Sequence, residues 1–576
     1  MTVDVVGEIT RAIKYPRRAR LCESATRAGL SEGLADERRP GCALRGGATR
    51  KRTVNLGVNV DTCLLHTLQY TTCHPLTSCR SGGRAGRVMR EHQWARGVAC
   101  RPRRLYAEMT VATETRRPHA KFDPSAFESF RFTARELDDR GRVTLGYALD
   151  EELAFTEVFE LPLGDPGRRL DEAERERVDG LLALLHWVAG VSYYKTALPP
   201  NVACETGVPP PAVATLLEAL YSEGLAELAY TNDLAALPQP SFGDGASSTR
   251  PVTAAGTSAP SPDAAQRILV PVGGGKDSAV ALEIVRRSGH ELALFSLGDA
   301  PPIARTVAAA GLPRLLATRT LDPGLPALNA AGALNGHVPI TAIVSCVALL
   351  SAALNGFDAV AMANERSASA GNVMWDGVEV NHQFSKSFRA ERLLSAALAQ
   401  GACGPRLFSV LRPASELAIA RAFARMERYH GAFTSCNAIF RIDPALRAAS
   451  WCCDCPKCRF VFLAMAPFTA PQQLREIFGS DLLDDERQFE GFALLTATGG
   501  HKPFECVGEE QESLAAIRLL AREERWSRHS VVRRLVDEVL PQFPAGTGEP
   551  DAALALSDEH SVPASLLAEV RAVLGA

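Results

Sequence analysis

The chain has 576 residues, of which 46% are hydrophobic and 22% charged, a globular composition long enough for about three or four domains. The net charge of −3 is unevenly spread. Residues 1–108 hold 20 Lys and Arg against 9 Asp and Glu, whereas the other 468 residues hold 43 against 57. This acidic body argues against duplex nucleic acid as the main partner, because phosphate contacts need a basic face.

Residues 1–108 differ from the rest of the chain. They are rich in arginine, contain six of the 15 cysteines and show little sustained apolar periodicity, and the start lacks the apolar core of a signal peptide. We expect a disordered or non-native extension, with translation beginning at Met89 or Met109. The alternative is a basic tail that binds nucleic acid or a membrane surface.

The segment 120–235 has the pattern of an α+β domain. Three apolar runs, separated by turns that contain Asp or Gly, are predicted strands: 130–133, 142–148 and 155–161. Asp171 and Glu174 form a capping box, which predicts a helix whose apolar residues fall on one face. Residues 236–263, rich in Gly, Ser and Pro, predict a flexible linker.

Strand and helix patterns alternate from 264 to 435. The predicted strands are 268–272, 291–297, 314–320 and 358–363, and a helix follows the first of them and stops near Gly289. This alternation predicts an α/β fold with a parallel sheet, helices on both faces and ligands at the carboxyl ends of the strands. Pro271 lacks a ladder donor, which predicts an early end to pairing there. The uncharged run 338–354 is short for a membrane span and predicts a buried helix.

The turn after the first of these strands is the most informative feature. It reads Gly273, Gly274, Gly275, Lys276, Asp277, Ser278. Glycines let the backbone approach a ligand closely, and a helix start directs unpaired N–H groups at an anion. Lys276 adds a positive charge, and Asp277 can hold Mg²⁺ beside phosphate oxygens. The pattern predicts a phosphate-binding loop, although its spacing is neither that of a Walker A loop nor of the dinucleotide fingerprint. An ordinary glycine-rich turn is the alternative.

This loop resembles the PP-loop of the ATP pyrophosphatase superfamily, whose members split ATP between the α and β phosphates and adenylylate a substrate oxygen. From about residue 125 to the C-terminus, further motifs stand at 191–195, 335–339, 364–369, 379–386, 451–458 and 501–506. Together they resemble one bacterial family, the ATP-dependent UDP-N-acetyl-α-D-muramoyl-L-alanyl-L-glutamate epimerases of peptidoglycan synthesis. The resemblance does not cover residues 1–108. It implies a PP-loop domain over 264–435, of the adenine nucleotide alpha hydrolase type.

The resemblance also implies the reaction. A cytoplasmic isomerase of this family inverts the terminal L-Glu of UDP-N-acetylmuramoyl-L-Ala-L-Glu to D-Glu and releases AMP and pyrophosphate. The α-nitrogen of that Glu is acylated, so a pyridoxal Schiff base cannot form. Adenylylation of the α-carboxylate removes the negative charge that opposes loss of the α-proton. We therefore expect an α-carboxyl adenylate, with ATP and Mg²⁺ required and neither nucleic acid nor membrane as a partner.

The residues that we expect to carry this reaction belong to the quoted motifs. The catalytic candidates are Lys276, Asp277, Glu365, Arg366, His382 and Lys386, and the nucleotide-binding candidates are Gly273, Gly274, Gly275, Lys276, Asp277 and Ser278. Arg366 suits a carboxylate or phosphate. His337, His382 and Lys386 suit an acid, a base or contacts to the UDP phosphates, while a single histidine is more often structural. The residues Tyr193, Tyr194 and Lys195 are equally compatible with core packing. The sequence identifies neither the proton-transfer pair nor the oligomeric state.

Four cysteines form a second constellation, in a predicted helical region over 436–576. The spacing of Cys436, Cys452, Cys455 and Cys458 suits a tetrahedral, structural Zn²⁺ site. Cys453 leaves the fourth ligand open. An iron–sulfur cluster and free thiols are the alternatives. Disulfides are disfavoured, because no export signal is evident.

Two other classes of function remain open at this point. One is a different PP-loop enzyme that modifies tRNA or a nucleobase. A basic face around the pocket would favour this function. The other is a nucleotide-sensing or zinc-scaffold protein without catalysis. It predicts ATP binding without AMP release, which leaves Lys276 and Asp277 hard to explain.

Overall fold

The computed structural model describes residues 121–164, 169–243, 267–402, 404–441 and 446–575. The expected N-terminal extension over 1–108 and most of the expected linker lie outside these residues. The confirmed class is α/β, with a large, mostly parallel sheet and a helical C-terminal region.

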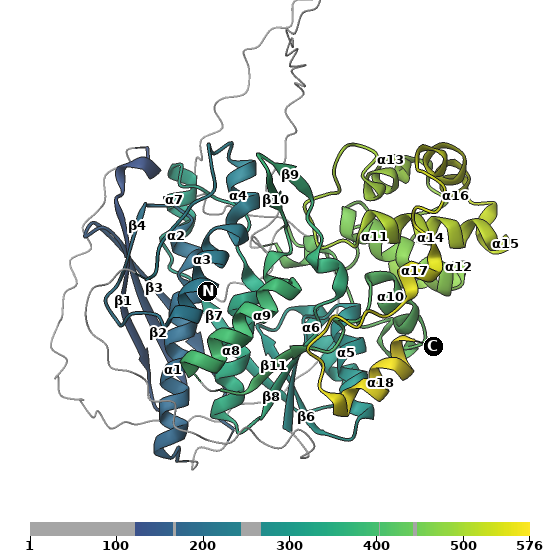
Figure 1. Ribbon diagram of the computed structural model, residues 1–576. Helices are drawn as coiled ribbons and strands as arrows, with labels where there is room; N and C mark the ends of the chain where they lie inside the picture. Colours follow the sequence, from purple (N-terminus) through teal and green to yellow (C-terminus); the bar gives the residue numbers. More distant parts are fainter. Residues whose placement is uncertain (1–120, 165–168, 244–266, 403, 442–445, 576) are drawn as a thin grey trace, which may run out of the picture. The chain divides into compact units, whose positions relative to one another are not determined.

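Within the described residues, one sheet has the strand order β11-β8-β5-β6-β7-β3-β2-β1-β4 (Figure 1). Its parallel strands are β5 (Arg267–Pro271), β6 (Glu291–Leu297), β7 (Arg314–Thr320), β8 (Ala359–Met362) and β11 (Arg406–Ser409). The strands β1 (Ser129–Leu137), β2 (Arg142–Leu149) and β3 (Leu153–Glu160) form an antiparallel meander, and β4 (Asn201–Cys204) lies parallel to β1. The predicted strands are thus confirmed.

The segment predicted as an α+β domain and the segment predicted as α/β share this sheet, because β3 pairs antiparallel with β7 through Val158, Phe159 and Glu160. The segment 120–235 therefore adds its strands to the edge of the parallel sheet. The first residues of the expected linker are also packed rather than free. Phe242 is 4% exposed, and its ring lies 5.0 Å from that of Tyr221. An aromatic side chain that fills the core holds the chain there, so the linker prediction is wrong at its start.

Helices cover both faces of the sheet, as predicted. In β5, Ile268 and Val270 pack into one core, while Leu269 packs into the other. On the first face lie α5 (Lys276–Arg287), α10 (Glu416–Ala424) and α18 (Ala564–Leu574); on the second lie α1 (Glu172–Ala189) and α8 (Ile340–Leu354). Full burial of each such Ile or Leu contributes about 1.5–3 kcal/mol. Because successive side chains of β5 point to opposite faces of the sheet, they pack against the helical layer on each face.

Two local predictions are confirmed at helices of the second face. Glu174 N donates to Asp171 Oδ1 at 2.7 Å, and Asp171 N donates to Glu174 Oε2 at 2.9 Å, which forms the capping box of α1. The uncharged run folds as α8, with most of its residues buried. None of the described helices has the length and apolar character that a membrane span requires.

The other helices complete the layers. They are α2 (Val191–Tyr194), α3 (Pro211–Tyr221), α4 (Ala226–Thr231), α6 (Pro301–Ala310), α7 (Leu325–Ala331), α9 (Phe388–Ala397), α11 (Pro456–Met465), α12 (Pro471–Phe478), α13 (Phe489–Ala493), α14 (Glu510–Arg522), α15 (Glu524–Ser527), α16 (Ser530–Arg534) and α17 (Pro550–Leu554). Buried residues of α11 and α14 share one core with α5. The helical C-terminal region therefore packs on the face of the sheet that carries the glycine-rich loop.

The strand order reverses next to β5. The chain moves from β5 through α5 to β6 on one side, and it returns through α8 to β8 on the other side. Pro271 is the last residue of β5, and β8 pairs only with Ile268 and Leu269, so pairing with β8 ends early as predicted. The prediction is wrong for β6, because Pro271 pairs with Phe295 and Val272 N donates to Phe295 O at 2.8 Å. Ligands of open α/β sheets bind outside the carboxyl ends of strands at such a reversal. The glycine-rich loop after β5 and the segment after β8 therefore meet at the expected position.

Candidate active site

The glycine-rich loop joins β5 to α5 and has the local geometry of an anion site. Gly275 caps α5 without a side-chain hydrogen bond, and Gly273 has no atom within 4 Å of the position of an added Cβ. Gly274 has a φ of +81°, and an added Cβ would lie 2.7 Å from the backbone of Ile303. Only glycine fits there. The helix α5 thus begins without a side-chain cap on its first N–H groups, and Ser278 closes the turn by donating to Gly275 O at 3.0 Å.

The side chain of Lys276 belongs to a buried ion-pair cluster. Its side chain is 1% exposed, and its ammonium donates to Asp277 Oδ1 at 2.5 Å and to Glu416 Oε2. Burial opposes the charged form, but the two carboxylates outweigh it and raise the pKa of Lys276. Lys276 therefore stays charged, and its charge is largely compensated within the protein.

Asp277 is the carboxylate of this cluster that reaches solvent, because its side chain is 21% exposed. Burial raises the pKa of Asp277, but the charges of Lys276, Lys457 and Lys386 lower it by more. The pKa of Asp277 therefore lies below its usual value. Burial and the neighbouring Asp277 raise the pKa of Glu416. An ionised carboxylate at the mouth of the loop is a suitable ligand for Mg²⁺.

Glu365 and Arg366 follow β8, and the structure separates them. Glu365 is 1% exposed, and its Oε1 has no hydrogen-bond partner among the described residues. An unsatisfied buried carboxylate oxygen is costly, which makes it a candidate for a ligand or metal contact. Arg366 instead donates to Ala555 O at 3.0 Å. Its role as a carboxylate or phosphate ligand stays a prediction.

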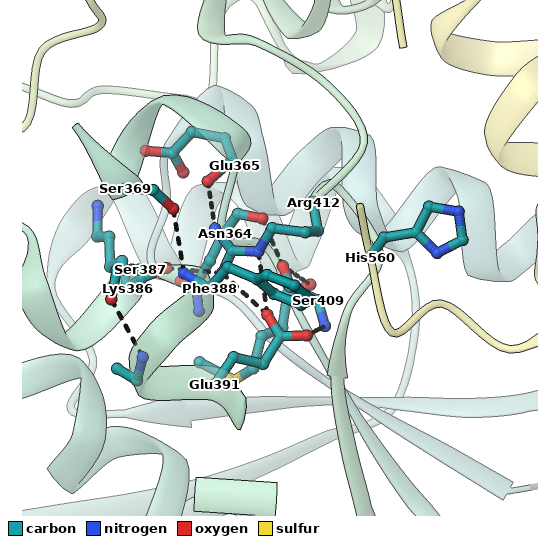
Figure 2. Close-up of polar contacts among 12 residues, drawn as sticks. Asn364, Glu365, Ser369, Lys386, Ser387, Phe388, Glu391, Ser409, Arg412 and His560 are labelled. Atoms are coloured by element: carbon teal, nitrogen blue, oxygen red, sulfur yellow. Dashed lines mark hydrogen bonds and ion pairs between the residues drawn. The ribbon is translucent and has the colours of Figure 1, made fainter. Parts of the chain in front are cut away.

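Arg412 holds the segments of two candidate residues together (Figure 2). It is 1% exposed and donates to Glu365 O at 2.5 Å and to Lys386 O at 2.6 Å. The carboxylate of Glu391 binds the same guanidinium, at 2.9 Å. Ser409 Oγ donates to Asn364 O at 2.5 Å. This buried network fixes the backbone from which Glu365 and Lys386 extend.

Lys386 connects the loop to the C-terminal region. The half-buried side chain donates to Gln383 Oε1 at 3.3 Å. Burial lowers its pKa, but negative charge on Cys506, Glu365 and Asp277 outweighs burial and raises the pKa of Lys386. The ammonium of Lys386 therefore interacts electrostatically with Asp277 of the loop and with Cys506 of the C-terminal region.

His382 belongs to a buried charge pair that involves a residue from α4. Its Nδ1 lies 2.5 Å from Glu227 Oε2. Burial opposes the imidazolium, but the charge of Glu227 and hydrogen bonds with Cys506 and Glu227 raise the pKa of His382 to about 10. The ring of His337 lies 4.3 Å from that of His382. Burial and the charge of His382 lower the pKa of His337 to about 3, so that only one of the two rings is charged at neutral pH.

The ligand atoms of Glu227, His337 and His382 all lie within 4.8 Å of one another, which is close enough for a metal ion. An ion at His382 would have to replace the hydrogen bond between its Nδ1 and Glu227 Oε2, which lie 2.5 Å apart. Both hydrogen-bonding directions of His382 are also taken, by Glu227 and by Cys506. The group is therefore better suited to keep His382 charged than to bind a metal ion.

Cys506 lies in a tight turn opposite this pair. Val507 N donates to Glu505 O at 2.8 Å, which places Cys506 at the centre of the turn. The Lys457 ammonium donates to Cys506 O, and the Gln383 amide donates to Val507 O at 3.2 Å. Cys506 is therefore held in place from two directions, while its side chain remains only half-buried.

Three cationic groups act on the Cys506 thiol. Burial raises the pKa of the thiol, but the charge of Lys386, the hydrogen bond with His382 and the charge of Lys457 lower it to about 5. Cys506 is thus a thiolate at neutral pH, next to an imidazolium and an ammonium. Such a thiolate is a reactive group.

The four predicted metal ligands come together. The Sγ atoms of Cys436, Cys452, Cys455 and Cys458 all lie within 4.8 Å of one another, and Cys452 Sγ and Cys458 Sγ are 3.8 Å apart. A tetrahedral ion with Zn–S bonds of about 2.3 Å places sulfur atoms about 3.8 Å apart. All four are free cysteines. Cys453 turns away, with its thiol 3.3 Å from Phe478 O. The geometry could therefore hold one ion, with Cys436 rather than Cys453 in the fourth position.

The motif at 191–195 packs in the core. Tyr193 and Tyr194 are almost fully buried, and Ser192 binds Arg319 through its hydroxyl at 2.8 Å. Lys195 donates to Asn335 Oδ1 at 3.1 Å, which orders the segment before His337. The two tyrosines therefore belong to the core, and Lys195 supports the segment that carries His337.

Sequence reasoning assigned no role to several residues of the site: Glu227, Arg412, Glu416, Lys457 and Cys506. Lys457 and Cys506 stand within quoted motifs, so a signal was present for them. Nothing in the local sequence marks Glu227, Arg412 or Glu416. Their partners stand far away in the chain, as for Lys276 and Glu416, which are 140 residues apart.

The fold and the site define an α/β protein with a buried cluster of ionised groups at the carboxyl ends of a mostly parallel sheet. Comparison with known proteins narrows this class. Residues 121–409 match the MurL N-terminal domain family, and residues 432–548 match the MurL C-terminal domain family. No solved structure matches the chain.

Curated relatives carry one name, UDP-N-acetyl-alpha-D-muramoyl-L-alanyl-L-glutamate epimerase. The chain is 47% identical over 424 residues to the protein from a Micromonospora species, a match that covers 72% of this chain and 91% of the relative. It is 40% identical over 454 residues to the protein from Xanthomonas oryzae pv. oryzae, covering 78% of this chain and 98% of the relative. The chain therefore belongs to the UDP-N-acetyl-α-D-muramoyl-L-alanyl-L-glutamate epimerase family.

Proposed function

We propose that this protein is a cytoplasmic enzyme of peptidoglycan precursor synthesis, which inverts the terminal L-Glu of UDP-N-acetylmuramoyl-L-Ala-L-Glu to D-Glu at the expense of ATP. The relatives' name supports the substrate and the inversion. The observation that carries the ATP requirement is the loop after β5, where the uncapped start of α5, the open position beside Gly273 and the ionised Asp277 lie together. This arrangement suits a polyphosphate with a bound Mg²⁺.

The chemistry explains why nucleotide would be consumed. An oxygen of the substrate α-carboxylate attacks the α-phosphorus of ATP and displaces pyrophosphate. The resulting acyl adenylate has no carboxylate charge next to the α-carbon, so its α-proton is far more acidic. After the proton is lost and a proton is regained on the other face, water releases AMP and the D-Glu product. Each well-placed donor to the enolate oxygen would contribute about 3–4 kcal/mol.

We assign the loop residues to the first of these steps. The N–H groups of 273–278 would bind pyrophosphate oxygens, and Asp277 would bind Mg²⁺. Lys276 holds Asp277 and Glu416 in place. The Oε1 of Glu365, which has no hydrogen-bond partner among the described residues, would bind the metal or the substrate.

We further propose that the four-cysteine site holds a structural Zn²⁺. The thiolates of an iron–sulfur cluster bind different iron atoms, whereas the close spacing of these sulfurs favours a single ion. Such an ion would fix the start of α11 and thereby Lys457, which lies between Cys455 and Cys458 and donates to Cys506 O.

One assay tests this function. The full chain is incubated with ATP, Mg²⁺ and UDP-N-acetylmuramoyl-L-Ala-L-Glu, and both AMP and the chirality of Glu are measured. We expect AMP and D-Glu in the wild type, and a loss of at least about 100-fold in Asp277→Asn. The matched control is Asp299→Asn, which changes an exposed acid after β6 that pairs with Arg314. AMP-free inversion, or no inversion, would contradict the proposal.

A further inference from the structure

The proton-transfer groups are the missing part of this reaction, and the structure offers a buried charge arrangement that the ATP loop does not use. It consists of Cys506 with its partners His382, Lys386 and Glu227. Inversion at a carbon needs a group that accepts a proton and a group that donates one. An anionic sulfur beside a cationic nitrogen supplies both.

Cys506 is the half-buried member of this arrangement. Its turn is closed by the hydrogen bond between Val507 N and Glu505 O, and Lys457 and Gln383 hold the backbone on either side. Among the cysteines of the described chain, Cys346 and the cluster residues Cys436 and Cys458 are buried. Cys506 thus combines a fixed backbone with a half-buried side chain and stands outside the four-cysteine site.

The partners of Cys506 are ordered by residues from other elements. Glu227 of α4 holds the His382 ring at 2.5 Å, and Asn372 Oδ1 accepts from His382 N at 2.9 Å. Arg412 binds Lys386 O at 2.6 Å, while Gln383 accepts from the Lys386 ammonium at 3.3 Å and also binds the segment of Cys506. Each group therefore has a defined position relative to the thiol.

The charge of Lys386 also links Cys506 to the nucleotide loop, because Lys386 acts on both Asp277 and Cys506. A substrate activated at the loop would therefore have its α-carbon within the field of the same ammonium. This ammonium stabilises an enolate as well as a thiolate.

We propose that Cys506 accepts the α-proton of the activated substrate and that Lys386 donates the proton that completes the inversion. His382 and Glu227 are positioning residues that keep Cys506 ionised. This inference rests on the proposed function, and it adds the acid and the base to it.

The step balances within the protein. The Cα–H bond breaks, its proton forms an S–H bond at Cys506, and its electron pair moves into the enolate of the acyl adenylate. An N–H bond of Lys386 then breaks and a new Cα–H bond forms on the opposite face. The thiol finally passes its proton to the neutral amine, which restores the thiolate and the ammonium for the next turnover.

The test separates proton transfer from ATP cleavage. Full-length wild type and Cys506→Ser are incubated in D₂O with Mg²⁺, ATP and UDP-N-acetylmuramoyl-L-Ala-L-Glu. AMP release and deuterium at the Glu α-carbon are both measured. We expect Cys506→Ser to lose at least about 100-fold in deuterium incorporation and D-Glu formation, with AMP release retained within about fivefold, since the adenylate still hydrolyses. Cys204→Ser, at the far edge of the sheet in β4, is the matched control and keeps both activities.

A second measurement covers the case in which Cys506→Ser does not fold. Wild type is treated with methyl methanethiosulfonate, and the modified cysteines are identified by peptide mass. Modification of Cys506 should abolish deuterium incorporation, and dithiothreitol should restore it. The modification rate should titrate with a midpoint near pH 5, and Glu227→Gln should raise that midpoint by about one pH unit or more, which a purely structural glutamate would not do.

The outcomes are distinct. Unchanged deuterium incorporation in Cys506→Ser, or in the protein modified at Cys506, overturns this inference and leaves the epimerase function intact. A wild type that shows neither AMP release nor deuterium incorporation overturns both. Loss of incorporation in Lys386→Met with AMP release preserved supports the donor role of Lys386. Unchanged inversion in that variant excludes it.

Discussion

The guanidinium of Arg412 donates to the backbone carbonyl of Lys386 at 2.6 Å. The same group binds Glu365 O and the carboxylate of Glu391, all in a buried setting. Arg412 contacts no nucleotide loop residue directly, yet it positions two candidate residues of the site. Its effect on stability and its effect on activity should therefore be separable.

We expect Arg412→Met to lower the free energy of unfolding by about 3–5 kcal/mol, because it leaves the Glu391 carboxylate buried without its partner. The double variant Arg412→Met, Glu391→Leu should recover most of this loss, since it removes both charges. AMP release should be lower than in the wild type in both variants, because the backbone carbonyls of Glu365 and Lys386 have lost the Arg412 donor. Thermal melting and AMP assays check this, and recovery of activity together with stability would show that Arg412 only supports the fold.

Two neighbouring glycines of the loop should respond differently to alanine. Gly274→Ala forces a side chain into the left-handed region, which costs about 1–2 kcal/mol, and against the backbone of Ile303, so the melting temperature should fall. Gly273→Ala meets no atom within 4 Å and should melt like the wild type. It should nevertheless weaken Mg-ATP binding by about tenfold, because the methyl group occupies the space of the phosphates. Calorimetric titration measures this, and unchanged ATP affinity in Gly273→Ala would contradict the assignment of the loop.

The four-cysteine site predicts metal content. Purified wild type should contain one zinc ion per chain, and Cys455→Ser should lose it and melt at a lower temperature. Cys453→Ser is the matched control, since its sulfur contacts Phe478 O instead of the cluster, and it should retain zinc. Elemental analysis and the absorbance spectrum decide the question. A brown protein with iron and sulfide would exclude zinc, and equal zinc content in both variants would exclude the assigned ligands.

The charge pair of Cys506 and His382 predicts a particular pH dependence of stability. In the folded protein the pKa of His382 is raised from 6.5 to about 10, and that of Cys506 is lowered from 9.0 to about 5. Between pH 6.5 and 9 the folded pair carries one proton on His382, and the unfolded pair carries one on Cys506. The number of bound protons is equal, so this pair adds no slope to stability there.

Removing the thiol exposes the contribution of the histidine. In Cys506→Ser, His382 still faces Glu227, and its stabilising effect is present below pH 6.5 and is lost as the pH rises toward its raised pKa. The stability of wild type relative to Cys506→Ser should therefore rise between pH 6.5 and 9, by at most about 1.4 kcal/mol per pH unit. Melting temperatures at several pH values measure this difference. A difference that stays constant with pH would mean that the pair is not ionised as described.

The parts of the fold and site that are encoded locally were predictable from the sequence. The strands, the capping box of α1 and the turn from β5 into α5 each depend on residues that are neighbours in the chain. The four cysteines were also predictable, because their spacing alone suits one ion. A motif of this kind carries its structure within a few residues.

The rest depends on contacts between distant segments. The pairing of β3 with β7 joins two segments that composition separates, and Phe242 packs where a linker was expected. Glu227 meets His382 across 155 residues of sequence. Arg412 meets Glu365 across 47 residues. No local pattern marks such residues, because an isolated Glu or Arg normally faces solvent.

The central claim is that the substrate carboxylate attacks ATP, and oxygen transfer tests it most directly. UDP-N-acetylmuramoyl-L-Ala-L-Glu labelled with ¹⁸O in the α-carboxylate of Glu is incubated with the wild type, ATP and Mg²⁺, and the AMP is analysed by mass spectrometry. The account predicts that each AMP acquires an ¹⁸O atom in step with the D-Glu formed, because the bond to phosphorus is made by a carboxylate oxygen. AMP without label, formed while Glu is inverted, would contradict it.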